Sequence, residues 1–229
     1  MSQLVRRAAF VGASVPVLAI AFALSLQRAQ PLGARTADGT THSTATAEEP
    51  SSRWLLGIKA KHKQFFDTPT ANGGVPLVHV MNYYDTYNKA FGVKDADIDA
   101  VLTFYGATTF YGLDDAAWEK YRLGEFLETN DPDTGRPAIK NPWRAEPQIL
   151  GLTLPQAGIE ALHRRGATFI LCNNALGIFS DLLAAKRGLD GKAVYADLRK
   201  HILPQVQLVP GMVVAVEQAA RAGMSYHRQ

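Results

Sequence analysis

Cysteine is the scarcest residue of this chain, because Cys172 is the only one among its 229 residues. A single thiol cannot close a disulfide within the chain, and it cannot supply a zinc site built from several cysteines. Outside a reducing compartment, an exposed free thiol is open to oxidation and to mixed disulfides. We therefore expect Cys172 to be either sheltered inside the protein or used in its chemistry.

Acidic residues are missing from the start of the chain, where none precedes Asp38. Arg6 and Arg7 stand before an uncharged, largely apolar stretch, residues 8–26. A charged start followed by an apolar core is typical of an export signal, and paired arginines indicate the twin-arginine route. The stretch also approaches the roughly 17–25 residues that span a bilayer, so a retained anchor is the alternative to a cleaved signal. We interpret residues 1–34 as an export signal or membrane anchor. The domain is then periplasmic or exported, and in the anchored case residues 8–26 hold it to the inner membrane.

The rest of the chain lacks an excess of either charge. The leader holds Arg6, Arg7 and Arg28. Without these three, the 24 Lys and Arg of the chain fall to 21, which equals its number of Asp and Glu. A protein that binds nucleic acid usually carries a basic patch that neutralises phosphates. No nucleic-acid partner is therefore predicted, and contact with a membrane is expected only through the N-terminal helix.

Two further segments follow the leader. Residues 35–52 are rich in Thr, Ser and Ala and show no apolar period, which is typical of a flexible linker. Residues 53–229 are enough for one domain with a sizeable core. Strands that alternate with helices predict an α/β fold with a mostly parallel sheet and helices on both sides, a three-layer sandwich. Five segments predict the strands, the first by its alternating pattern: residues 60–66, 98–105, 167–172, 205–209 and 224–227.

Proline and glycine predict where several helices begin and end. Pro76 is expected to open a helix that stops at Gly92, and Pro210-Gly211 to open another. Thr153 is a good N-cap, with Pro155 in the first turn and Gln156 at the capping-box position, so a helix is expected to start there. Residues 129–147, which contain four prolines, predict a long loop.

Cys172 closes the third predicted strand, and Asn173 and Asn174 follow it at the start of a helical pattern. In open α/β sheets, ligands bind at the edge where strands end, and free N–H groups at a helix start favour a thiolate there. Cys172 is therefore our candidate catalytic residue, with Asn173 and Asn174 as candidate ligand-binding residues. The alternative is that Cys172 is a small buried residue of the core, without a chemical role.

Three more residues are candidates for ligand binding. Gly106 and Thr108 lie in the loop that leaves the second strand, where small residues let backbone N–H groups approach a ligand. His79 lies on the helix that follows the first strand. We predict that the loops after the second and third strands lie on one edge of the sheet and form a shared pocket. The chain has no P-loop, dinucleotide fingerprint or complete calcium loop, so neither a cofactor nor a metal is predicted.

The C-terminal third, with FILCNNAL followed by LVPGMVVAVEQAARAGMSYHR, resembles the DsrE/DsrF-like superfamily. Members commonly show a strand–Cys segment, a short strand leading into a Pro-Gly helix start, and a closing Gly-x-x-Tyr strand. The resemblance covers roughly residues 58–229. It is closest to an exported branch that has a DWEKYRLGE-like segment, which is residues 115–125 here.

This resemblance implies a flavodoxin-like, three-layer α/β sandwich that often assembles into trimers or hexamers. In sulfur-relay members a cysteine carries sulfane sulfur as a persulfide, and Cys172 is the only residue to which that role can be carried over. The implied function is a sulfurtransferase or sulfur carrier whose partner is a sulfur donor or acceptor protein. The alternative is a non-catalytic α/β module that binds a small ligand or a protein partner outside the inner membrane, with Cys172 buried as a structural residue.

Overall fold

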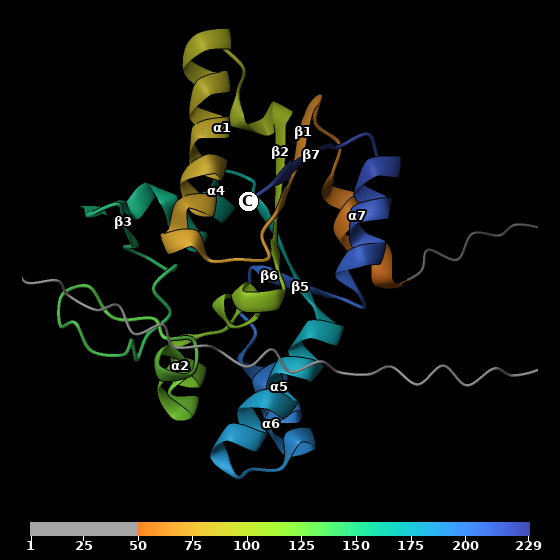
Figure 1. The fold of residues 1–229 in the computed structure, drawn as a ribbon. Coiled ribbons are helices and arrows are strands. Elements are labelled where there is room, and N and C mark those ends of the chain that lie inside the picture. Colours follow the sequence, from red (N-terminus) through yellow and green to blue (C-terminus); the bar gives the residue numbers. More distant parts are fainter. Residues whose placement is uncertain (1–49) are drawn as a thin grey trace, which may run out of the picture. The chain divides into compact units, whose positions relative to one another are not determined.

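The computed structural model describes residues 50–229, which Figure 1 draws in colour. The predicted export signal or anchor, residues 1–34, and most of the predicted linker, residues 35–52, lie outside the described residues. Within residues 50–229 no helix combines the length and the apolar character that crossing a membrane requires. Residues 53–229, which the sequence assigns to one domain, fall within one compact unit.

Five parallel strands form the central sheet, in the order β6-β5-β2-β1-β7 (Figure 1). In register, Phe104 of β2 lies opposite Leu171 of β5, and Cys172 of β5 lies opposite Val209 of β6. The inner strands β2 and β5 are nearly continuous apolar runs because both of their faces are buried, whereas the edge strand β7 is largely exposed. The five predicted strands are confirmed: β1 His62–Asp67, β2 Ile98–Phe104, β5 Thr168–Cys172, β6 Val206–Val209 and β7 Ser225–Arg228.

Alternate side chains of the strands point into two separate cores. On one face, Phe66 and Leu102 pack with residues of α1, α4 and α5. On the other face, Phe65 and Ile170 pack with α7 and with the 3₁₀ helix η1. The fold is therefore α/β, with helices on both sides of the sheet. The bounds are η1 Pro50–Gly57, α1 Val75–Phe91, α2 Asp115–Tyr121, α3 Leu123–Phe126, α4 Ile159–Arg164, α5 Asn173–Arg187, α6 Gly191–Leu198 and α7 Met212–Arg221.

The order of the strands explains why α7 lies on a face of its own. From β1 to β2, β5 and β6, the chain steps along the sheet in one direction. Right-handed connections then place the intervening helices on the same face. From β6 to β7 the chain steps back across the whole sheet, so the same handedness places α7 on the opposite face. Figure 1 shows α1 and α7 on the two sides of the strands, and α5 and α6 beyond the carboxyl end of β5.

The ends of α1 follow the predicted signals. Pro76 lies in its first turn, and the N-cap is Gly74, whose φ of 86° favours glycine. Gly92 ends the helix with φ 65°, and its N–H bonds to the carbonyl of Tyr87. The predicted helix is thus confirmed at both ends. The start of α7 after Pro210-Gly211 is confirmed as well.

The prediction that a helix starts at Thr153 is wrong. Leu152–Thr153 instead forms strand β4, which pairs antiparallel with β3, Gln148–Ile149. The two loop residues, Leu150 and Gly151, both have positive φ, at 54° and 75°, as a tight two-residue hairpin requires. A 3₁₀ turn follows, and α4 begins only after Gly158, where a Cβ would lie 2.5 Å from a carbonyl oxygen.

Candidate functional site at the carboxyl ends of β5 and β6

The carboxyl ends of β5 and β6 form the topological switch point of the sheet. From β5 the chain enters α5, which packs on one face, and from β6 it enters α7, which packs on the other. In open α/β sheets, ligands bind outside the carboxyl ends of strands whose chains leave in opposite directions. Cys172 is the last residue of β5, and Met212 is the first residue of α7. The candidate cysteine therefore lies at the position where this fold class places its ligands.

The Cys172 sulfur accepts two backbone hydrogen bonds from two different helices. The N–H of Ala175 in α5 donates to Sγ at 3.4 Å, and the N–H of Met212 in α7 donates to it at 3.3 Å. The first N–H groups of a helix have no partner within the helix, so each usually finds a side-chain acceptor. Cys172 is the N-cap of α5, with its sulfur in the role that a Ser or Asp oxygen commonly takes.

The thiol is largely enclosed by apolar neighbours. Cys172 is 5% exposed and belongs to the core cluster that contains Ile170, Val209 and Met212. The loop after β6 closes over the first turn of α5, because the N–H of Asn174 donates to the carbonyl of Pro210 at 3.3 Å. In this arrangement the sulfur is held in position by backbone groups and has little contact with solvent.

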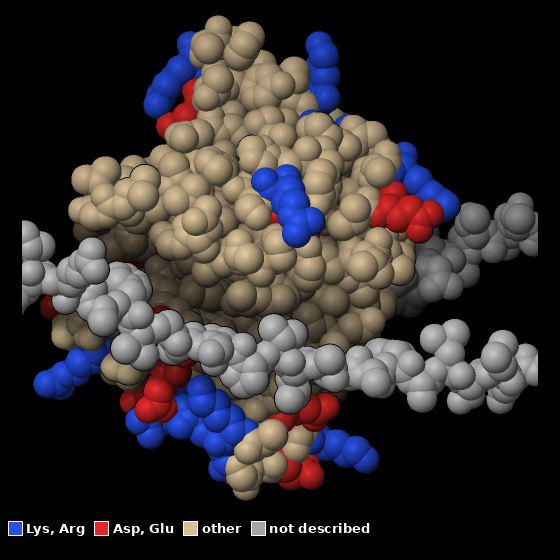
Figure 2. All heavy atoms as spheres, viewed as in Figure 1, with Lys and Arg blue, Asp and Glu red and all other residues tan. Residues whose placement is uncertain are grey.

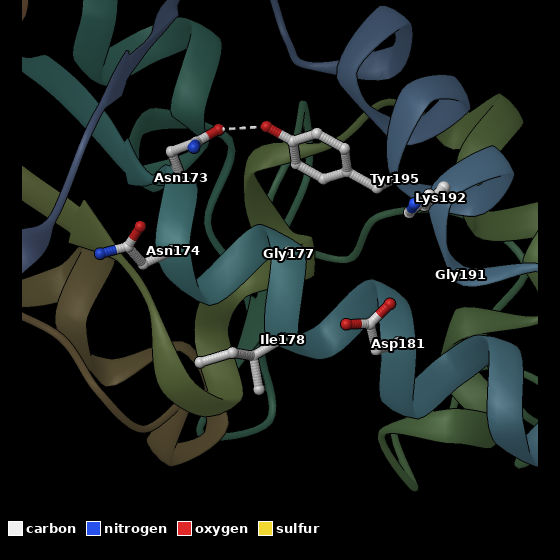
Figure 3. Close-up of a pocket in the computed structure, with 8 residues that line it drawn as sticks. All are labelled: Asn173, Asn174, Gly177, Ile178, Asp181, Gly191, Lys192 and Tyr195. Carbon is white, nitrogen blue, oxygen red and sulfur yellow. Dashed lines mark hydrogen bonds between the residues drawn. The ribbon is translucent and has the colours of Figure 1, made fainter.

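A pocket of about 530 Å³ begins beside this cysteine, between α5 and α6. Tyr195 of α6 donates its hydroxyl proton to Oδ1 of Asn173 at 2.6 Å, which fixes the two helices to each other at one end of the pocket (Figure 3). Asp181 and Lys192 lie toward its other end, and neither forms an ion pair within residues 50–229. The pocket thus offers a carboxylate, an ammonium group and amides to a ligand. Its lining residues are Asn173, Asn174, Gly177, Ile178, Asp181, Gly191, Lys192 and Tyr195.

Gly106 and Thr108 lie on the predicted edge but do not line this pocket. The edge they share with Cys172 is confirmed, because they follow β2, the parallel neighbour of β5. The Thr108 side chain is fully buried and donates to the carbonyl of Thr68 at 2.5 Å. Gly106 has φ 58°, and a Cβ there would lie 3.0 Å from the carbonyl oxygen of Pro69. Both residues join the loop after β2 to the loop after β1, which is a structural role.

His79 is placed away from Cys172, on the other face of the sheet. Its ring lies on α1, and Nδ1 is 2.5 Å from Oε1 of Gln229. It lines a different pocket, together with Phe66 and His227. Of the candidate residues, the structure brings together Cys172, Asn173 and Asn174, whereas His79 is not part of that group.

Two polar residues, Asp67 at the end of β1 and Tyr195 on α6, were not among the candidates. Asp67, the last residue of β1, is 3% exposed and accepts a hydrogen bond from the hydroxyl of Tyr226, while its Oδ1 is buried without a partner among the described residues. Burial and the Asp67 carboxylate raise the pKa of Tyr105, so its hydroxyl stays protonated. The signal was available, since Asp67 directly follows the predicted strand of residues 60–66. Tyr195 carried no such signal, because its partner Asn173 lies 22 positions earlier in the chain.

Neither the described structure nor comparison with known proteins supports a metal site or membership of a known family. In the part of the chain that the structure describes, no group of three or more His, Cys, Asp or Glu side chains is arranged to hold a metal ion. Comparison with known proteins gave no match to a family model, to a curated protein or to a solved structure. The DsrE/DsrF-like resemblance therefore stays a prediction, and the functional argument depends on the geometry around Cys172.

Proposed function

We propose that this protein handles sulfane sulfur at Cys172, as a sulfur carrier or sulfurtransferase with a DsrE-like, three-layer fold. The observation that supports the proposal is the convergence of the Ala175 and Met212 N–H groups on a single sulfur atom. Amide donors at helix starts bind anionic acceptors well, and both a thiolate and a persulfide are anionic sulfur species. A carrier needs only one cysteine, which agrees with the cysteine content of the chain.

The chemistry requires two sulfur transfers that balance without an external oxidant. The Cys172 thiolate attacks the terminal sulfur of a polysulfide, so one S–S bond forms, one breaks, and a shorter polysulfide anion leaves. An acceptor thiolate then attacks the outer sulfur of the persulfide, and the Cys172 thiolate leaves with the electron pair of the broken bond. The sulfur atom moves from donor to acceptor, and the cysteine returns to its starting state.

The pocket between α5 and α6 supports this proposal as an entry site for the donor. Asn173 and Asn174 line it and belong to the helical turn that Cys172 caps. Lys192 supplies a positive charge for an anionic polysulfide chain. Since Cys172 is only 5% exposed, the loop that holds Pro210 over Asn174 must move before sulfur can reach the thiol. We expect the reaction rate to depend on that loop.

The burial of Cys172 favours a second candidate function. A thiol packed among Ile170, Val209 and Met212 can act as a structural cap for two helices. The protein would then be a non-catalytic module whose ligand occupies the pocket between α5 and α6. With Asp181 and Lys192 both lining the pocket, a small zwitterion fits its charges.

Intact-mass spectrometry after incubation with inorganic polysulfide distinguishes the two functions. The proposal predicts an increase of about 32 Da for each added sulfur, removed by dithiothreitol and absent from Cys172→Ser. Serine keeps an oxygen acceptor for both N–H groups, so this variant should remain folded. If native Cys172 resists both polysulfide and alkylation but reacts once the chain is denatured, sulfur handling is ruled out in favour of the binding module.

The location and partners form part of the same proposal. We propose an exported domain, anchored or released by residues 1–34, that exchanges sulfur with a donor or acceptor protein and assembles as a trimer or hexamer. The charge pattern of Arg6, Arg7 and residues 8–26 supports export, and the oligomer rests on the resemblance. Fractionation of cells that express an Arg6→Lys, Arg7→Lys variant tests the route, because normal export of that variant would remove the twin-arginine assignment. Light scattering tests the oligomer, which a monomer would exclude.

A further inference from the structure

A second pocket lies on the opposite face of the sheet from the core that contains Cys172, between α1 and strands β1 and β7. It holds about 400 Å³, and no carboxylate, ammonium or guanidinium group lines it. Figure 2 shows few charged side chains on the surface over α1 and β7, whereas they gather around α5 and α6. We call it the aromatic pocket, and its lining residues are Gln64, Phe66, His79, Asn82, Tyr83, Thr86, Tyr87, Phe91 and His227.

The topology explains why this pocket is open. β7 is an edge strand, and the helix that precedes it, α7, covers the other face of the sheet. On the face of the aromatic pocket, α1 lines the pocket together with β7, and α1 contacts β2 as well. His227 of β7 and residues of α1 line the pocket together.

One ridge of α1 supplies most of the wall. His79, Tyr83, Tyr87 and Phe91 recur at intervals of four residues, so their side chains stack along one side of the helix. Phe66, which is 1% exposed, lies between this ridge and β7. At the far end of the ridge Phe91 is 68% exposed, although a large apolar ring is usually covered.

The rings contact one another in an unbroken series. Their centroids are separated by distances at which aromatic pairs attract each other, so each ring restricts the motion of the next. The walls are therefore largely fixed before a ligand enters, which lowers the entropic cost of binding. The centroid distances are 5.4 Å for His79–His227, 5.6 Å for His227–Phe66, 5.7 Å for Phe66–Tyr83, 5.1 Å for Tyr83–Tyr87 and 5.6 Å for Tyr87–Phe91.

The polar groups of the pocket include an imidazole that is held by a hydrogen bond. Because the carbonyl Oε1 of Gln229 can only accept, the hydrogen bond from His79 places a proton on Nδ1, so Nε2 is the acceptor of the neutral imidazole. Burial and the nearby His79 lower the pKa of His227, which keeps that imidazole neutral. Asn82 and Thr86 add an amide and a hydroxyl on the solvent side.

We propose that the aromatic pocket binds a planar, uncharged aromatic molecule that carries an N–H or O–H donor at its edge, of the indole or phenol class. The flat ring matches walls made of aromatic faces and edges, and the donor matches Nε2 of His79. A cation is a poorer occupant, because no carboxylate lines the pocket. This site is independent of sulfur handling at Cys172.

Titration of the full chain with indole, followed by calorimetry and saturation-transfer NMR, tests the proposal. Indole should bind saturably, and 1-methylindole, which lacks the N–H donor, should bind about two- to tenfold more weakly because one hydrogen bond is lost. In His79→Phe, which keeps a ring but removes the acceptor, the two compounds should bind with equal affinity. Tetramethylammonium should not compete with indole.

Matched lysine variants locate the site. Thr86→Lys places a charge in the exposed rim of the pocket and should weaken indole binding by about tenfold or more. Ala220→Lys adds the same charge to an exposed position on α7 and should leave binding unchanged, as should Cys172→Ser. Two results would overturn the proposal: indole binding that does not saturate, or saturable binding that Thr86→Lys leaves intact. A concentration-dependent dimer that Thr86→Lys disrupts, without any indole binding, would assign the surface to a second copy of the chain instead.

Discussion

Cys172 and the aromatic pocket belong to the same sheet but are built in opposite ways. At Cys172 the decisive contacts come from the backbone, since two helix starts on opposite faces donate to one enclosed sulfur. In the aromatic pocket the decisive contacts come from side chains, and the rings stand on the helix α1, on β1 and on the edge strand β7. Strand order thus creates both features: it closes one end of the sheet with two helices and leaves the other end partly open.

The comparison also shows where each region derives its stability. Phe66 is fully packed at the base of the aromatic pocket, while Phe91 at its rim is mostly solvated. Cys172 contributes a small apolar surface but accepts two hydrogen bonds that nothing else among its neighbours replaces. The following predictions separate these contributions in order of expected effect.

Phe66→Ala should have the largest effect on stability. Removing a buried phenyl ring leaves a cavity, so the free energy of unfolding should fall by about 3–5 kcal/mol in urea denaturation. Phe91→Ala, the matched control on the same pocket, should change it by less than about 0.5 kcal/mol because its ring is exposed. Equal losses for the two variants would mean that the ridge on α1 acts as one packed unit, in conflict with the distinction between base and rim.

Cys172→Ala should have an intermediate effect. It removes the acceptor of the Ala175 and Met212 N–H groups, and leaving buried donors unpaired costs about 1–3 kcal/mol. Cys172→Ser keeps an acceptor oxygen and should lose less stability than the alanine variant in the same experiment. If alanine and serine are equivalent, the two hydrogen bonds to sulfur do not contribute to folding, and the cap assigned to Cys172 is wrong.

The smallest effect should be the contribution of His227 to the pH dependence of stability. Its pKa is lowered in the folded protein, mainly by burial, so the unfolded state binds a proton more readily. Stability should therefore be unaffected well above the ordinary histidine pKa of about 6.5 and should fall as the pH drops below it. In denaturation at pH 7.5 and pH 5.5, His227→Gln should lose less stability between the two pH values than the wild type. The matched control His163→Gln, at an exposed position, should behave like the wild type. If His227→Gln has the same pH dependence as the wild type, His227 does not contribute to the pH dependence of stability.

The inner strands of the sheet could be predicted from the sequence because β2 and β5 are apolar runs whose signals are local. The same is true of the position of Cys172, since a strand that ends in Cys172-Asn173 must present both at the carboxyl edge. The ends of α1 followed from Pro76 and Gly92, which act within one turn of the helix. Each of these features depends only on residues that are close together in the chain.

The features that were missed depend on contacts between distant residues or on unusual backbone. Thr108 was expected to face a ligand, but it bonds to Thr68, 40 positions earlier, and is therefore buried. The β3–β4 hairpin went unrecognised because Leu150 takes a positive φ that leucine rarely adopts. The aromatic pocket could not be predicted from the ridge on α1 alone, since its other wall requires β7 to lie beside β1.

The pairing of β1 with β7 also determines the order in which the sheet can form. β1 is the first strand of the sheet in the chain, whereas its outer partner comes last, with Phe65 opposite Tyr226. Until residues 225–228 have been synthesised, β1 is an unprotected edge with free backbone groups, of the kind that pairs with other chains. A contact this distant in the chain closes late and slows folding. We expect nascent or truncated chains that lack the final strand to aggregate through β1.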